Sequence, residues 1–256
     1  MTSTETISTP TRSIPSTFLP AKSEDDNVAS FVRSELQQDI VRQVVRQKLR
    51  KQRHLVLPKA IDAAYLDELF PQLLDLFNPQ TVYYNGGIAK VPEWKISCYL
   101  EVMEGGVPTT HPNLELQAHF EPLLDACNDI FLFWYHQQHA CNKVNQKPVQ
   151  GCHRLMTFVT RYTPNPGEQA LLKHVDGAGK VDGSVVVALP IDRWSAPESE
   201  NAFEGGGITF WDGGNEIHYD TRSGDLALID RAVWHQADPI IKGTRWALVI
   251  FYRVER

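Results

Sequence analysis

The sequence predicts one mainly β domain, a β-sandwich or jelly roll, with flanking helices and a few strands in the part of the chain that precedes it. Two patterns lead to this prediction. From Arg154 onward, short alternating runs are separated by Gly, Pro, Asn and Asp, which is typical of a fold built from many short strands. Before Arg154, longer stretches carry apolar residues at three- and four-residue intervals, which indicates amphipathic helices.

Length and composition limit the class of protein. A chain of 256 residues can form one good-sized domain with an ample buried core. Its formal net charge of −6 argues against a nucleic-acid partner, since phosphate binding needs a basic surface. The four cysteines show no Cys-x-x-Cys spacing and are predicted to be free thiols of a reducing compartment. No apolar run approaches a membrane span, so we expect a cytoplasmic protein; the sequence does not indicate its oligomeric state.

Three regions are expected along the chain. Residues 1–26 are rich in Ser, Thr and Pro with few large apolar groups, so we expect a disordered tail. An organelle-targeting signal is the alternative, which Glu5 and the presence of only two basic residues weaken. Residues 27–150 are expected to form a supporting region of helices and strands, and residues 151–256 the jelly-roll core.

The supporting region is predicted from helical periodicity and turn signals. Asp26 or Asn27 is expected to cap a helix with apolar positions from Val28 to Leu49 that reaches the basic run 46–53. We interpret this run as a solvated helix end, with a phosphate or anionic-membrane patch as the alternative. Further elements are expected as a strand at 54–57, a helix to Phe77, strands at 81–84 and 94–100, and a helix at 113–140.

The jelly-roll core is predicted from seven short runs that turn signals separate. They lie at 155–163, 170–176, 184–191, 207–211, 216–219, 226–229 and 244–254. The segment 192–203 is a long insertion among them, and it fits a mobile substrate lid as well as a plain surface loop.

His174 and Asp176 lie two residues apart in one of the expected strands, so their side chains should point to the same face. A metal held there needs at least one more ligand. His235, shortly after the apolar run 225–230, is the best candidate. Two histidines and one carboxylate on one face of an octahedron leave the opposite face open, a ligand set that indicates a non-haem Fe(II) oxygenase.

Arg245 indicates which co-substrate would fill that open face. It begins an expected strand ten residues after His235, and if it points inward then Ala247, Val249 and Phe251 share its face. A guanidinium fork is suited to a bidentate grip on a carboxylate. 2-Oxoglutarate fits, because its 2-oxo acid end can chelate iron while its distal carboxylate meets the arginine.

These residues belong to an ordered series that resembles the Fe(II)/2-oxoglutarate-dependent dioxygenases, and within them the prolyl 4-hydroxylase-like branch. The resemblance covers roughly residues 150–254, with a weaker echo at 54–77. The series is Arg161-Tyr162, Gly167, His174-x-Asp176, Glu204-Gly-Gly-Gly-Ile-Thr-Phe210, Gly224-Asp225, His235 and Arg245.

The resemblance implies a fold, a ligand set and a reaction. The fold is the double-stranded β-helix, a cupin-like jelly roll. Fe(II) would be held by His174, Asp176 and His235, and 2-oxoglutarate by Arg245. The implied reaction hydroxylates an unactivated C–H of an amino-acid-like, peptidyl or small-metabolite substrate. It uses O2 and releases succinate and CO2, with ascorbate as a candidate reductant.

Two further residues enter the co-substrate site through the resemblance. Tyr162 matches a tyrosine that lines the co-substrate pocket in the family. The sequence departs from the hypoxia-type prolyl hydroxylases at 185–190, where no tyrosine stands to bind a carboxylate. Tyr162 or Thr244 is therefore expected to complete the grip around Arg245. Asp176 as the carboxylate ligand favours hydroxylation over halogenation.

Two alternatives remain open at this point. One is a catalytically silent jelly-roll binding module, and the other is a cupin-type metalloenzyme that uses no 2-oxoglutarate. His136 and His139 form a separate i, i+3 pair, which we interpret as a wet helix end because no third ligand stands nearby in the sequence.

Overall fold

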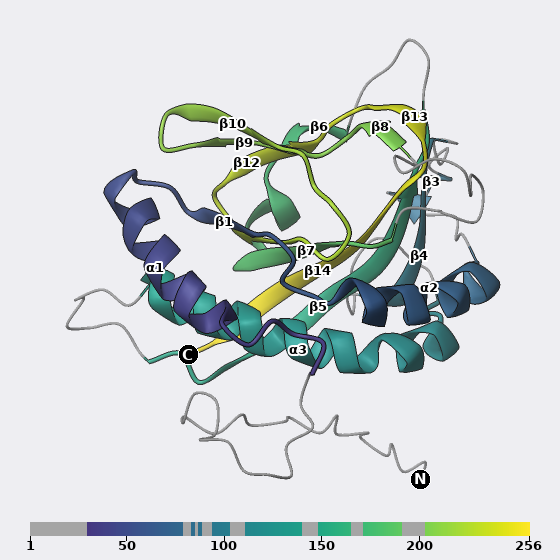
Figure 1. Ribbon diagram of the computed structural model, residues 1–256, viewed down its shortest axis with the longest axis horizontal. Helices are drawn as coiled ribbons and strands as arrows, with labels where there is room; N and C mark the ends of the chain where they lie inside the picture. The colour runs from purple at the N-terminus through teal and green to yellow at the C-terminus, as the bar shows by residue number, and fades with distance from the viewer. Residues whose placement is uncertain are drawn as a thin grey trace, which may run out of the picture.

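The computed structural model describes residues 30–78, 83–84, 87–88, 94–102, 111–139, 148–164, 171–190 and 203–256 (Figure 1). The predicted disordered tail at 1–26, Gly167 and nearly all of the 192–203 insertion lie outside the described residues. Cys98, Cys127 and Cys152 are free thiols, as predicted. None of the described helices is long and apolar enough to cross a membrane.

Two antiparallel sheets face each other and enclose the centre of the molecule (Figure 1). The larger sheet has the order β1 (His54–Leu57), β11 (Leu226–Asp230), β7 (Gly183–Ala188), β14 (Arg245–Glu255), β5 (Gly151–Tyr162) and β4 (Lys95–Glu101). The smaller sheet has the order β10 (Asn215–Tyr219), β9 (Ile208–Asp212), β12 (Trp234–Ala237) and β6 (Leu171–His174). Short pairs join β13 (Ile240–Gly243) to β8 (Phe203–Gly205) and β2 (Tyr83–Tyr84) to β3 (Gly87–Ile88).

The order of the strands is that of a jelly roll. From β5 onward the chain crosses repeatedly between the sheets: β6, β9, β10 and β12 lie in the smaller sheet, while β7, β11 and β14 lie in the larger one. Every pairing of these strands is antiparallel. The predicted fold class, a mainly β jelly roll with flanking helices, is confirmed.

Three helices lie on the outer side of the larger sheet, with α2 and α3 below it in Figure 1. They are α1 (Leu36–Leu49), α2 (Ala63–Leu76) and α3 (Leu114–His139). Residues of β14 that point toward the helices are large and buried, and Tyr252 stacks on Phe131 of α3 with ring centroids 4.2 Å apart. This side of the sheet is therefore filled by the hydrophobic core, which leaves the opposite side for a cavity.

The first helix begins later than predicted. Val32 forms a β-bridge with Ile61, and the backbone N–H of Arg33 donates to the carbonyl of Ala60. Because this segment is paired with residues 60–62, α1 starts only at Leu36. The apolar periodicity from Val28 onward could not reveal this, because the competing partner is distant in the sequence.

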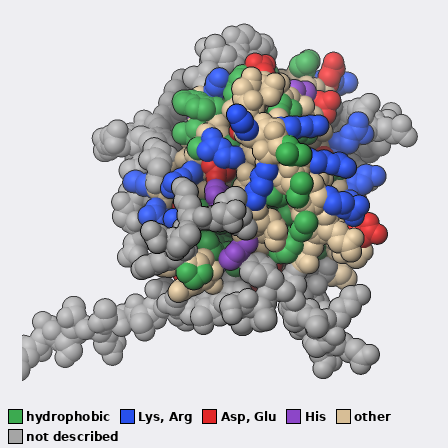
Figure 2. Space-filling model, turned by 90° about the vertical axis from the view of Figure 1, so that its left-hand side faces the viewer, with side chains coloured by type: hydrophobic (Ala, Val, Ile, Leu, Met, Phe, Trp, Pro, Cys, Tyr) green, Lys and Arg blue, Asp and Glu red, His purple; other side chains and the backbone are tan. Residues whose placement is uncertain are grey.

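The apolar face of α1 is also narrower than predicted. Leu36, Ile40 and Val44 are buried, whereas Val45 and Leu49 are 56% and 82% exposed. Lys and Arg side chains gather on the face of the molecule shown in Figure 2, interspersed with hydrophobic ones. Within the basic run, the Lys48 ammonium donates to the Gln137 carbonyl at the end of α3, a favourable position for a cation.

Four strands were not predicted, and others were predicted too long. β3, β8, β12 and β13 have two to four residues each, too few to show an alternating pattern. The expected strand at 170–176 ends at His174, and Asp176 begins a 3-10 turn (Asp176–Gly179).

Candidate metal centre

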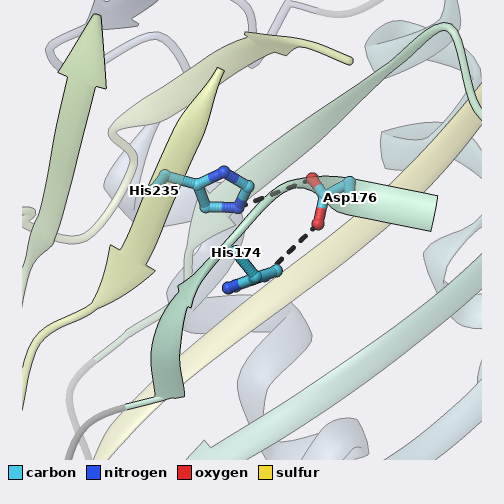
Figure 3. Close-up of side chains that lie close together, drawn as sticks. All are labelled: His174, Asp176 and His235. Carbon is cyan, nitrogen blue, oxygen red and sulfur yellow. Dashed lines mark ion pairs between the residues drawn. The ribbon is translucent and has the colours of Figure 1, made fainter. Parts of the chain in front are cut away.

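His174, Asp176 and His235 meet between the two sheets (Figure 3). They come from the end of β6, the start of the 3-10 turn and the middle of β12. His174 and His235 are register partners in the pairing of β6 with β12, which brings residues 61 positions apart to the same height. One ligand atom from each of the three residues lies within 4.8 Å of the others.

The backbone after β6 explains how Asp176 reaches this point although the strand has ended. Val175 keeps an extended conformation, with φ −112° and ψ 148°, so side chains two residues apart still point to one side. Gly177 then takes φ +59°, and a Cβ atom there would come within 2.6 Å of the Val181 side chain. A glycine is therefore needed directly after the carboxylate to start the turn.

The distances in the triad suit a shared ion better than direct hydrogen bonds. Asp176 Oδ1 lies 3.5 Å from His174 Nε2, and Asp176 Oδ2 lies 3.5 Å from His235 Nε2. Ligand bonds of about 2.1 Å at right angles place donor atoms about 3 Å apart, so a small inward shift would complete the site. Nitrogen and carboxylate donors in this ratio fit Fe(II), with coordination positions left open on the cavity side.

Neighbouring groups orient two of the donors. The Ser184 hydroxyl of β7 donates to Asp176 Oδ2 at 2.5 Å. His235 Nδ1 lies 3.1 Å from the Val233 carbonyl, which fixes the ring with Nε2 toward Asp176. Ser184 was not among the predicted site residues, although it is a polar residue in an otherwise apolar strand.

The pKa shifts favour the metal-binding forms of these side chains. Burial alone would raise the pKa of Asp176, but its contact with His174, the positive charge of His235 and the hydrogen bond from Ser184 hold it below its usual value. Burial lowers the pKa of His235. The carboxylate is thus charged and the His235 imidazole neutral near pH 7, as metal coordination requires.

A cavity of about 250 Å³ adjoins the triad. Alternate residues of β14 form part of its wall, namely Arg245, Ala247, Val249 and Phe251, the set expected to share one face. Gln236, Lys95 and Ser97 also line it and were not singled out from the sequence. Thr244 is half-buried and is not among the lining residues, so its predicted role in co-substrate binding remains a prediction.

Arg245 is a buried cation, and no ion pair joins it to a carboxylate among the described residues. Its side chain lines the cavity while the residue is only 3% exposed, and its Nε has no hydrogen-bond partner. The guanidinium lies 5.4 Å from the ring centroid of Tyr162, which also lines the cavity. Burial lowers the pKa of Arg245, and the charge of Asp238 offsets only part of that effect. A buried charge that is only partly compensated is costly, so this site favours an anionic ligand.

Two histidines outside the triad lie beside acidic side chains of their own. His139, the last residue of α3, has its Nε2 atom 3.0 Å from Asp230 Oδ2 of β11. His218 lies between Asp220 and Asp238. Among the described residues, the triad is the single group of three side chains arranged to hold a metal ion.

Solved structures of other proteins share this fold. A 2OG-Fe(II) oxygenase family protein from Burkholderia pseudomallei superimposes with a TM-score of 0.57 at 17% identity, covering 84% of this chain and 90% of that one. A prolyl-4-hydroxylase from Pseudomonas putida gives 0.54 at 13% identity, covering 84% and 99%. The fold of this chain is that of the 2-oxoglutarate–Fe(II) oxygenases.

A third solved structure shows that this fold carries more than one kind of reaction. The α-ketoglutarate-dependent epimerase SnoN from nogalamycin biosynthesis gives a TM-score of 0.52 at 14% identity, covering 84% of this chain and 83% of that one. No protein-family model and no curated protein matches the sequence. At these identities the likeness establishes the shared fold, and the chemistry has to be argued from the site.

Proposed function

We propose that the protein is a non-haem iron dioxygenase that uses 2-oxoglutarate to hydroxylate an unactivated C–H bond. The observation that carries this proposal is the buried guanidinium of Arg245, which forms no ion pair with a described carboxylate, in the same cavity as the His174, Asp176 and His235 donors. A metal site alone would fit many enzymes. A metal site together with such a buried cation fits a ligand that chelates at one end and is anionic at the other.

Each half of the site has a defined task. His174, Asp176 and His235 would hold Fe(II), and Arg245 would donate two hydrogen bonds to the distal carboxylate of 2-oxoglutarate. When bound, Fe(II) supplies O2 activation coupled to oxidative decarboxylation of 2-oxoglutarate, so that one oxygen atom enters the substrate and the other enters succinate. Tyr162, beside the guanidinium, would close the pocket around that carboxylate.

The protein contributes binding, orientation and exclusion of water. The walls between the two charged ends include Val186, Ile208, Ala237, Ala247 and Val249, which are apolar. They would keep the middle of the co-substrate out of water and direct its 2-oxo acid end toward the open metal positions. His174 is the most exposed side chain of the triad, at 33%, so the substrate C–H would approach on its side, whether it belongs to an amino acid, a peptide or a small metabolite.

Calorimetry can test this proposal by measuring the affinity of the Mn(II)-loaded protein for 2-oxoglutarate. Loss of one partner of a buried charged hydrogen-bonded pair costs about 2–5 kcal/mol, so Arg245→Gln should weaken binding by about 30-fold or more. Arg161→Gln is the matched control, because Arg161 lies on β5 against the Trp246 ring and does not line the cavity.

Three outcomes separate the alternatives. Failure of 2-oxoglutarate to bind the metal-loaded protein would leave a metalloenzyme that works without it. Binding without any succinate release, over a broad panel of substrates with Fe(II) and O2, would leave a silent binding module. Succinate release accompanied by a substrate mass gain of one oxygen atom is the result that the proposal expects.

A further inference from the structure

The cavity contains a second cation besides Arg245. Lys95 of β4 lines the cavity and is half-buried, and no ion pair joins it to an acidic side chain of the described residues. Lys95 and Arg245 both pair in register with Tyr162 of β5, from opposite sides. With neighbouring strands about 4.8 Å apart, their Cα atoms are separated by about 10 Å.

The two cations differ in how solvent reaches them. Arg245 lies on β14, between β7 and β5 inside the larger sheet, and is almost fully buried. Lys95 lies on β4, which ends the larger sheet, and β6 with His174 ends the smaller sheet. The cavity is thus bordered by an edge strand of each sheet. Arg245 is therefore placed to bind a ligand at the buried end of the cavity. Lys95 is placed to bind a ligand that enters the cavity from solvent.

An apolar wall adjoins Lys95 on the same face of the sheet. Tyr99 and Phe158 have ring centroids 5.4 Å apart, and Phe158 meets Phe251 edge-on at 5.8 Å. All three line the cavity, as does Met156. Phe251 is the register partner of Ser184, whose hydroxyl binds Asp176, so this wall lies beside the metal-binding carboxylate.

We propose that the substrate is an organic carboxylate whose hydrocarbon part lies on the wall of Tyr99, Met156, Phe158 and Phe251 and whose carboxylate pairs with Lys95. This inference rests on the proposed function. In it, the aromatic wall positions the substrate C–H that reacts, and Lys95 recognises the carboxylate of the same substrate. An ammonium is a point charge that one carboxylate neutralises, and a partly buried ion pair of this kind selects acids over neutral analogues.

The experiment compares acids with their primary amides on protein loaded with Mn(II) and 2-oxoglutarate. The probes are 4-phenylbutanoate and 6-phenylhexanoate, each against its amide, with dissociation constants from ligand-observed NMR. A charged hydrogen bond is worth about 1.5–3 kcal/mol, so an acid should bind at least about tenfold more tightly than its amide. Lys95→Gln should abolish that preference and leave the amide affinity within about threefold.

Two further variants sharpen the result. Phe158→Ala should weaken the acid and the amide equally, because it removes wall area and not charge. Lys173→Gln is the matched control, since Lys173 is exposed with its ammonium 4.2 Å from the Trp211 ring centroid and does not line the cavity. It should leave both affinities unchanged.

The outcomes distinguish this inference from the proposed function. Equal affinity for acids and amides, or no detectable binding of any acid, would overturn the carboxylate subsite even if 2-oxoglutarate binds through Arg245. A loss of 2-oxoglutarate affinity in Lys95→Gln would assign Lys95 to the co-substrate instead. Tighter, Lys95-dependent binding of 4-phenylbutyl phosphate would overturn the choice of carboxylate. Lys95-dependent preference for acids without any 2-oxoglutarate binding would sink the proposed function alone.

Discussion

Two buried clusters of histidine and aspartate lie close together in this molecule, and they differ in what fills the space between the side chains. In one, His54 Nδ1 and Asp212 Oδ2 are 2.8 Å apart, a direct hydrogen bond. In the other, Asp176 stands 3.5 Å from both His174 and His235. The first cluster has no room for a ligand, whereas the second leaves a gap that an ion would close.

The surroundings of the clusters explain the difference. His54 is fully buried and stacks on Phe210 with ring centroids 4.2 Å apart, and Asp212 also accepts from the backbone N–H of Arg53. Phe210 also faces His235, with ring centroids 6.2 Å apart, so its aromatic ring lies between the two clusters. Because it is packed on all sides, the first cluster is a structural hydrogen bond between β1 and β9. The second cluster borders the cavity and is therefore a candidate binding site.

The largest expected effect is on metal binding. Alanine at His174, Asp176 or His235 should weaken Fe(II) or Mn(II) binding by more than about 100-fold, since losing an outer partner of a ligand already costs 10–100-fold. Equilibrium dialysis with metal analysis measures it. His218→Gln is the control, because that histidine also lies between two carboxylates, Asp220 and Asp238, but on the surface. Equal metal affinity in His174→Ala and in the control would show that the open cluster is not a metal site.

The next effect is on stability. His54→Ala leaves the buried Asp212 carboxylate without its imidazole partner, so the free energy of unfolding should fall by about 3–5 kcal/mol. Urea denaturation followed by circular dichroism measures the change. His153→Ala, which breaks a surface contact with Glu255, should stay within about 0.5 kcal/mol. A His54 variant as stable as that control would mean that the hydrogen bond between His54 and Asp212 does not contribute to the free energy of unfolding.

The stability that the His54–Asp212 hydrogen bond contributes should also depend on pH. Hydrogen bonds from His54 and from the Arg53 backbone outweigh the effect of burial and lower the pKa of Asp212. Its carboxylate therefore contributes stability above its ordinary pKa, and that contribution is lost as the pH falls through the folded value. Asp212→Asn should cost about 1.5–3 kcal/mol at pH 7 and progressively less below about pH 4.

Unfolding free energies of the wild type and Asp212→Asn over this pH range test that dependence. Asp75→Asn, at an exposed position of α2, gives the baseline for an ordinary carboxylate. If the difference between wild type and Asp212→Asn were the same at pH 3.5 and pH 7, the charge on Asp212 would not be the stabilising feature.

The smallest effect concerns the orientation of the ligand set. Ser184→Ala removes the hydroxyl that donates to Asp176 Oδ2 and should weaken metal binding by about tenfold without abolishing it. Ser223→Ala serves as the control, because the Ser223 hydroxyl has no hydrogen-bond partner. Calorimetry with Mn(II) measures both. An unchanged affinity in Ser184→Ala would show that the metal alone orients the carboxylate.

Much of the candidate site could be predicted from local patterns. The alternation of β14 placed Arg245 on one face with Ala247, Val249 and Phe251, and the structure has all four lining the cavity. The spacing of His174 and Asp176 predicted a common direction. That expectation held although the strand ends between them, because Val175 stays extended.

The parts that could not be predicted depend on distant partners. Ser184 and Lys95 matter because of the residues opposite them in the sheet, and a single strand does not show which residues those are. His54 gave no signal, since its aspartate partner lies 158 positions further along the chain. The start of α1 was predicted wrongly for the same reason, as residues 31–33 pair with 60–62.

The sequence by itself determined which residues could coordinate a metal and which faces of the strands are apolar, because side-chain chemistry and the two-residue period of a strand are local properties. Only the tertiary structure decided that one histidine–aspartate cluster closes on itself while the other stays open to a cavity. That decision depends on packing: Phe210 and Arg53 fill the space around His54 and Asp212, while the opposed sheets leave space beside His174, Asp176 and His235.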